Sequence, residues 1–153
     1  LRFGRPSVPN FTPENKDFEI GKAIKMQDGD DVTIIATGHL VWEALEAIKE
    51  LDKKGISADL LNIHTIKPLD QDSILKSVRK TGCVLTAEEH NYWGGLGESV
   101  ARILVKNHPV PQEFVATNDT FGESGTPSEL MNKYKINSNS IVSSVLRLLK
   151  KSE

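Results

Sequence analysis

The chain has 153 residues, the size of one ordinary domain, and such a domain buries about 70% of the surface that its unfolded chain exposes. Charged residues make up 26% of the sequence and nearly balance, with 19 basic and 21 acidic side chains and a formal net charge of -2. This balance argues against a nucleic-acid-binding surface or a polybasic membrane patch, because both need clustered basic residues. We therefore expect neither nucleic acid nor a membrane among the partners.

A single cysteine, Cys83, cannot form a disulfide framework within the chain and favours a reducing compartment, so we expect a cytoplasmic protein. No apolar run approaches the roughly 20 residues that span a bilayer, and nothing in the sequence resembles a signal peptide. The sequence opens on Leu1 rather than Met, which suggests a piece excised from a longer protein.

Residues 1–17 hold three of the seven prolines and show no hydrophobic periodicity, which is typical of an extended connector. We expect this segment to link a preceding domain to a folded domain at residues 18–153, as such connectors usually do. Arg2 and Arg5 could bind an anion there, although paired arginines in a linker are more often solvated.

The first half of the folded domain predicts a strand, helix, strand unit. Strands are expected at residues 18–26 and 32–36, and Asp28-Gly29 between them is a hairpin signal that would make the first strand antiparallel to the second. A helix with apolar residues at helical spacing is expected at 39–53, followed by a strand at 56–63. A strand, helix, strand unit predicts a right-handed parallel crossover.

In the second half, Asp70 is placed to cap a helix that runs to about Lys80 and ends at Gly82. A buried strand should follow from Cys83, then a helix from about Glu98 and a short strand at 113–116. Thr126-Pro127-Ser128-Glu129 is a capping box that should start another helix, and residues 141–149 form an amphipathic closing helix. The sequence thus predicts five strands and about five helices in an α/β domain.

The stretch from Thr86 to Val105 is the best candidate for a working surface, because a strand, a glycine turn and a helix meet there. The exits of three predicted parallel strands fall at one end of the sheet, where ligands and partner surfaces gather. They form a polar crevice that could bind an anion at a helix amino terminus, serve regulation, or contact a partner. Residues of these types more often serve as caps and turns in an ordinary domain. The candidate residues are Gly38, His64, Glu88, Glu89, His90, Gly94, Gly95 and Gly97.

Other site chemistries find little support in the sequence. His64 or His90 could pair with Glu88 or Glu89 as acid and base, but such pairs are also common in structural networks. The four histidines are far apart and there is no cysteine pair, so we expect no zinc site. Cys83 lies in an apolar strand, where burial disfavours a reactive thiolate. The Walker phosphate loop and the dinucleotide fingerprint are both absent.

The order of the motifs resembles the carboxyl-terminal domain of transketolase through nearly the whole chain. Each motif is short, and it is their order and spacing that make the combination specific. The motifs are RFGRPSVP at 2–9, FEIGKA at 18–23, Thr37-Gly38, TIKPLD at 65–70, TAEEHNYWGGLGES at 86–99 and SGTPSEL at 124–130.

The resemblance implies a three-layer α/β/α domain with a mixed five-stranded sheet whose first strand is antiparallel. It also implies a reaction, the transfer of a two-carbon ketol unit between sugar phosphates in the pentose phosphate pathway, with thiamine diphosphate and a divalent metal (Mg or Ca) as cofactors. In that family the metal and diphosphate motif and the activating glutamate lie in the two preceding domains. We therefore expect no catalytic, cofactor-binding or metal-binding residue in this chain, and no activity from it alone.

The implied partners are the cofactor-binding domains of the same enzyme, in the same chain or in a split subunit, within a homodimer. Two alternatives stay open. The decarboxylase beta subunits of 2-oxo-acid dehydrogenase complexes and 1-deoxyxylulose-5-phosphate synthase share the domain, and SVRKTG at 77–82 leans towards the dehydrogenase subunits, in which it would be a docking module. A free-standing flavodoxin-like nucleotide binder is the other alternative.

Overall fold

The structure is a computed structural model that describes residues 8–12 and 18–152. Most of the predicted linker, including Arg2 and Arg5, lies outside the described residues. In the described part of that segment, Phe11 stacks on Trp42 with ring centroids 6.2 Å apart. This stretch therefore packs against the folded domain at one point.

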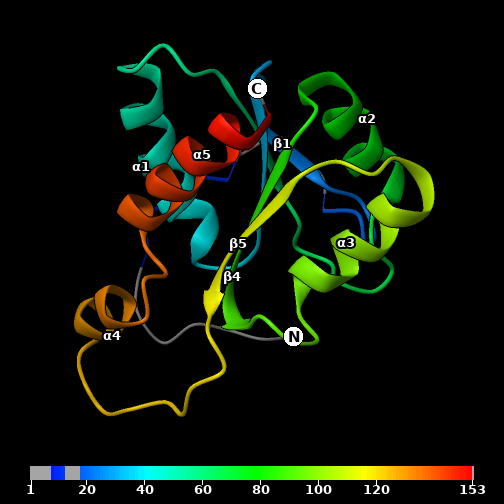
Figure 1. Ribbon diagram of the computed structural model, residues 1–153. Helices are drawn as coiled ribbons and strands as arrows, with labels where there is room; N and C mark the ends of the chain where they lie inside the picture. The colour runs from blue at the N-terminus through cyan, green and yellow to red at the C-terminus, as the bar shows by residue number, and fades with distance from the viewer. Residues whose placement is uncertain (1–7, 13–17, 153) are drawn as a thin grey trace.

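Five strands and five helices form within the described residues, close to the ranges expected from the sequence (Figure 1). The strands are β1 (Ile24–Gln27), β2 (Val32–Ala36), β3 (Ala58–Asn62), β4 (Val84–Asn91) and β5 (Gln112–Thr117). The helices are α1 (Leu40–Asp52), α2 (Gln71–Thr81), α3 (Leu96–Asn107), α4 (Pro127–Lys133) and α5 (Ser138–Ser152).

The strands form one mixed sheet in the order β1-β3-β2-β4-β5. Four strands, β2 to β5, are parallel, and β1 pairs antiparallel with β3, with Ile24 opposite Asn62. The mixed sheet with an antiparallel first strand is confirmed. The predicted hairpin is wrong, because β1 pairs with β3 rather than with β2. Gly29 is needed for space instead of for a positive φ, since a methyl group there would overlap the backbone of Ala58.

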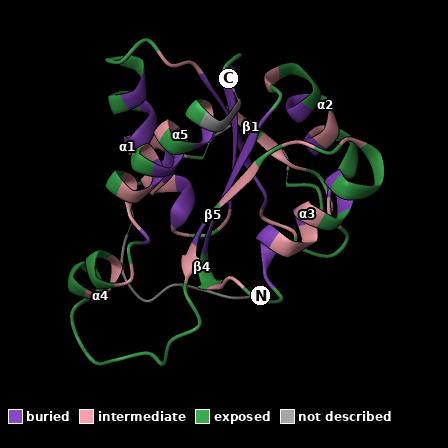
Figure 2. Cartoon of the chain, viewed as in Figure 1, coloured by how far each residue is buried: buried purple, intermediate pink, exposed green. Residues whose placement is uncertain are grey.

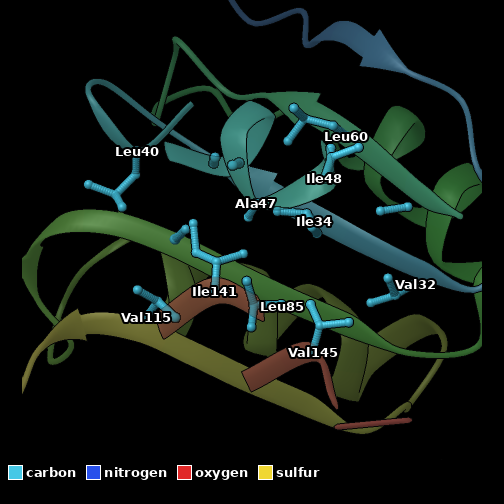
Figure 3. Close-up of a cluster of buried hydrophobic side chains, with 14 of the residues drawn as sticks. Val32, Ile34, Leu40, Ala47, Ile48, Leu60, Leu85, Val115, Ile141 and Val145 are labelled. Atoms are coloured by element: carbon cyan, nitrogen blue, oxygen red, sulfur yellow. The ribbon is translucent and has the colours of Figure 1, made fainter. Parts of the chain in front are cut away.

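Helices cover both faces of the sheet and make three layers, with α1 and α5 on one face and α2 and α3 on the other (Figure 1). Successive strand residues point to opposite faces, so Ile34 packs under α1 and α5 while its neighbour Ile35 packs under α2 and α3. Figure 3 shows the first of these clusters, in which Ile141 and Val145 of α5 lie over Leu85 of β4. The three-layer prediction is confirmed.

Local signals in the sequence explain where several helices begin and end. Asp70 caps α2 by accepting a hydrogen bond from the backbone N–H of Ser73 at 3.1 Å. Gly82 ends α2 in the left-handed conformation, with φ of 74°. Thr126 and Glu129 exchange both hydrogen bonds of the capping box at the start of α4. Each of these predictions is confirmed.

Three boundaries that bear on the candidate site differ from the expected ones. The first strand starts at Ile24 rather than Phe18, because a turn intervenes in which the Lys22 N–H donates to the Glu19 carbonyl. The strand β4 continues through Asn91, so Glu88 belongs to the strand rather than to the turn beyond it, and α3 starts at Leu96. These shifts decide how the candidate site is built.

Candidate functional site

The predicted strand exits meet at one edge of the sheet, which we call the carboxyl edge. Gly38 follows β2, His64 follows β3, and Glu88 to His90 lie near the end of β4. These three strands are parallel neighbours, so their ends lie side by side. In Figure 1 this edge lies where the arrows of β4 and β5 end.

The Glu88 carboxylate is buried at this edge and is directed at the start of α3. Its Oε2 accepts a hydrogen bond from the Leu96 N–H at 2.7 Å, and its Oε1 accepts one from the Gly97 N–H at 2.8 Å. Glu88 is only 3% exposed. A carboxylate at this position is favoured by the positive end of the helix dipole. The amides that an external anion would use are therefore engaged by the chain itself.

The three glycines of the turn are required for different reasons. Gly94 has φ of 73°, and its N–H donates to Glu98 Oε2 at 2.7 Å. A methyl group at Gly95 would overlap the Glu88 carboxylate, and one at Gly97 would overlap the Phe114 ring. Only Gly94 needs glycine for its conformation, while Gly95 and Gly97 are needed because no side chain fits. At β2, Gly38 also has a positive φ, of 59°.

Neither candidate histidine is directed at Glu88. His64 is half-buried, with Nδ1 3.0 Å from Thr65 Oγ1 and its ring centroid 4.5 Å from that of Phe18. His90 is exposed, and its Nδ1 lies 2.7 Å from the carbonyl oxygen of its neighbour Asn91. The Glu89 side chain is exposed next to it. The acid–base pairing considered from the sequence has no support in the hydrogen bonds that Glu88, His64 and His90 make.

Large apolar side chains are exposed around the same edge. They come from the segment before β1 and from the connections that follow β3, β4 and β5. None of them is among the candidate residues expected from the sequence, and the missed signal was apolar residues within polar turn segments. Figure 2 shows the long exposed connection between β5 and α4 on this side. The residues, with their exposed fractions, are Phe18 65%, Ile20 71%, Ile66 45%, Trp93 56% and Phe121 97%.

A second polar cluster, away from these residues, was not predicted. Asp59 is fully buried in β3 and accepts hydrogen bonds from Lys25 Nζ and Ser77 Oγ, each at 2.9 Å. Lys80 Nζ lies 3.1 Å from the same carboxylate. Hydrogen bonds from Lys80 and Lys25 lower the pKa of the exposed Asp28 beside them to about 2. A charged residue inside an otherwise apolar strand was the signal that could have revealed this cluster.

Within the described residues, no group of three or more His, Cys, Asp or Glu side chains lies close enough together to hold a metal ion. None of the helices in the same residues is long and apolar enough to cross a membrane.

Residues 21–141 match the family model described as Transketolase, C-terminal domain. This chain belongs to the transketolase C-terminal domain family. The match begins just before β1 and ends in the first turn of α5, so it contains the whole sheet.

Curated relatives carry transketolase names. The 6-deoxy-6-sulfo-D-fructose transketolase subunit SqwH of Clostridium sp. (strain MSTE9) is 46% identical over 138 residues, which cover 90% of this chain and 42% of the relative. A protein of Phocaeicola vulgatus named as one of the subunits of an apulose-4-phosphate transketolase is 39% identical over 99% of this chain and 48% of its own length. The transketolase of Mus musculus is 39% identical over 99% of this chain and 25% of its own.

A solved structure described as a split gene transketolase, inactive beta4 tetramer, superposes on this domain with a TM-score of 0.94 and 40% sequence identity. The superposition covers 98% of this chain and 49% of that chain. This transketolase C-terminal domain thus spans less than half the length of the two subunit relatives described above. Its described residues form the five-stranded sheet and the helical layers on both faces of it.

Proposed function

We propose that this transketolase C-terminal domain is the non-catalytic carboxyl-terminal part of a thiamine diphosphate-dependent transketolase. The complete enzyme transfers a two-carbon ketol unit between sugar phosphates, and we place it in the pentose phosphate pathway. The domain packs against the cofactor-binding domains through its carboxyl edge and supports a homodimeric enzyme. Two of the relatives are named as subunits, which supports a partner encoded as a separate polypeptide.

The exposed apolar side chains of the carboxyl edge carry this proposal. Four separate segments each place at least one large apolar residue at this edge, from Ile20 before β1 to Phe121 after β5. Burying such a side chain contributes roughly 1.5–3 kcal/mol, and apolar residues gathered on one side of a soluble domain mark a contact surface. A partner that covers this edge would bury several of them together.

The amino terminus of α3 does not fit a site for the diphosphate group of thiamine diphosphate. A diphosphate group binds well at a helix amino terminus, but at α3 the N–H groups of Leu96 and Gly97 are engaged by Glu88. The described residues also lack a cluster of metal-binding side chains. We therefore assign no step of the cofactor chemistry to this chain, and its role in the enzyme is structural.

Reconstitution tests the proposal. The chain is mixed with the polypeptide that carries the cofactor-binding domains, and ketol transfer is assayed with thiamine diphosphate, magnesium and a panel of ketose and aldose phosphates. We expect co-elution at micromolar concentrations and turnover only from the mixture. Turnover by the 153-residue chain alone would contradict the non-catalytic role, and a partner polypeptide that neither co-elutes nor gains activity would contradict the docking role.

A further inference from the structure

The two edges of the sheet differ in how they are protected against pairing with another strand. Soluble proteins protect a free edge with a short strand, an irregular register or a lysine. The edge strand β1 has all three, because it is four residues long, its register shifts between Lys25 and Gln27, and it contains Lys25 itself. The other edge strand, β5, is regular from Gln112 to Val115 and contains neither lysine nor proline. Figure 1 shows β5 at the front of the sheet, between α5 and α3. The unprotected edge is therefore β5.

The backbone of β5 offers hydrogen-bonding groups along this edge. In a parallel pair, alternate residues of a strand bond to the neighbouring strand. The carbonyl oxygens of Pro111 and Thr117 accept from N–H groups at the start of β4 and just beyond its end, so the odd-numbered residues of β5 face β4. The even-numbered residues, Gln112, Phe114 and Ala116, face away from the sheet. Within the described part of the chain, no hydrogen bond reaches their backbone N–H and C=O groups.

The side chains around this edge allow another strand to approach. Phe114 is 37% exposed, and its ring lies 6.4 Å from that of Tyr92 in an edge-to-face arrangement. Glu113 is the charged residue of β5, and Arg147 Nη2 lies 3.6 Å from its carboxylate, so the strand presents no uncompensated charge. Between β5 and α5 lies a hollow of about 630 Å³. The edge is thus apolar at its centre and open on the side of α5.

We propose that β5 pairs antiparallel with β5 of a second copy of this chain, across a two-fold axis at Phe114. Antiparallel pairing of identical strands is symmetric, so a two-fold axis makes the same edge complementary to itself. In this register, Phe114 exchanges both hydrogen bonds with Phe114 of the second copy, and Gln112 does the same with Ala116 of the second copy. All the outward-facing backbone groups of β5 are then paired.

The occupant is a second copy because each free group of the edge finds its counterpart on an identical strand. The two Phe114 rings also lie side by side on the same face of the joined sheet, and aromatic cross-strand pairs stabilise antiparallel sheets. The contact lies along β5 and is separate from the carboxyl edge. It does not depend on the proposed function, and its tests need no cofactor-binding partner.

Analytical ultracentrifugation of the 153-residue chain at micromolar to millimolar concentrations tests the association. We expect a reversible equilibrium between monomer and dimer. Phe114→Lys places a protecting lysine at the centre of the contact and should lower the association constant at least tenfold. Val105→Lys is the matched control, because it adds the same charge at a residue of α3 that is 75% exposed. A chain that stays monomeric at millimolar concentration, or equal weakening by both variants, would overturn the proposal.

A cysteine cross-link tests the register. In the proposed pairing the Cα atoms of the two Phe114 residues are about 5.5 Å apart, a separation that a disulfide can bridge. Phe114→Cys should therefore form an intermolecular disulfide on mild oxidation at least tenfold faster than Gln112→Cys, because Gln112 lies opposite Ala116 and far from its own counterpart. Cys83 is only 1% exposed and is shielded from the oxidant. Equal rates for the two variants, or no cross-link, would contradict the pairing.

Discussion

The backbone N–H of Gly97, in the first turn of α3, donates a hydrogen bond of 2.8 Å to Oε1 of Glu88, a side chain of β4. The second oxygen of Glu88 accepts from Leu96, so one buried carboxylate satisfies two of the N–H groups that a helix start leaves free. Glu88 therefore ties the strand to the helix that follows it and fixes the turn between them.

Replacing Glu88 by Gln should destabilise the domain by about 1–3 kcal/mol. The Gln side chain keeps one oxygen that can accept a hydrogen bond. Its NH₂ group would replace the other oxygen and face a backbone N–H of α3, and that N–H would stay buried without an acceptor. Urea unfolding followed by circular dichroism measures the free energy of unfolding. Glu19→Gln is the control, because the Glu19 side chain is exposed, and it should change stability by no more than about 0.5 kcal/mol. Similar losses in both variants would contradict the capping role.

Replacing Gly95 by Ala should destabilise by about 2 kcal/mol, because the new methyl group overlaps the Glu88 carboxylate and displaces it from α3. Gly55→Ala separates this effect from backbone strain. Gly55 has φ of 74°, and a methyl group there meets nothing within 4 Å, so only the conformational cost of about 1 kcal/mol applies. Thermal unfolding of both variants gives the comparison. The combination Gly95→Ala with Glu88→Ala should lose less than the sum of the single changes, since the two residues touch.

The pH dependence of stability should report on Asp70. Burial alone would raise the pKa of Asp70, but hydrogen bonds from the N–H groups of Ala23 and Ser73 and from the Ser73 hydroxyl outweigh burial and lower it below 3.8. Because this pKa is lower in the folded state, the stabilisation is fully present above about pH 4, near the pKa of the unfolded chain, and is lost as the pH falls through the folded value.

Asp70→Asn isolates this contribution. Asn still caps a helix well, but its NH₂ group cannot accept the hydrogen bond that Ala23 donates to Oδ2 at 2.8 Å. We expect a loss of about 1–2 kcal/mol at pH 7, and the difference from the wild-type chain should shrink as the pH falls below about 4. Urea unfolding at a series of pH values measures it. A difference that stays constant down to about pH 2.5 would contradict the assignment to the ionised carboxylate.

Removing an apolar side chain at the carboxyl edge should weaken binding to the cofactor-binding partner. Trp93 is 56% exposed, and buried tryptophans are frequent binding hot spots, so Trp93→Ser should lower the affinity at least tenfold, or by about 1.4 kcal/mol. Val105→Ser is the control, because Val105 is 75% exposed but lies near the opposite end of α3. Isothermal titration calorimetry measures both. Equal weakening by the two variants would indicate that the partner does not cover the carboxyl edge selectively.

The sequence determined the elements of this protein and most of their ends, because these depend on local chemistry. The helical spacing of apolar residues predicted α1 and α5. Single residues predicted helix boundaries, such as Gly82 at the end of α2 and Thr126 before α4. The parallel crossovers also follow locally, since a strand, helix, strand unit has one favoured hand. The order of the motifs placed the chain in its family.

Tertiary structure decided which parts meet. Asp28-Gly29 has the sequence of a hairpin turn, yet β1 pairs with β3 rather than with β2. Gly29 lies against the backbone of Ala58, at the start of β3. Packing across the whole sheet decides which strand an edge strand pairs with. The N–H groups at the start of α3 donate hydrogen bonds to Glu88 and are therefore not free for an external anion. This happens because β4 continues far enough to bring the Glu88 carboxylate to the start of the helix. The pairing of Asp59 with Lys25 and Lys80 joins residues far apart in the sequence, and only the folded sheet brings their charges together.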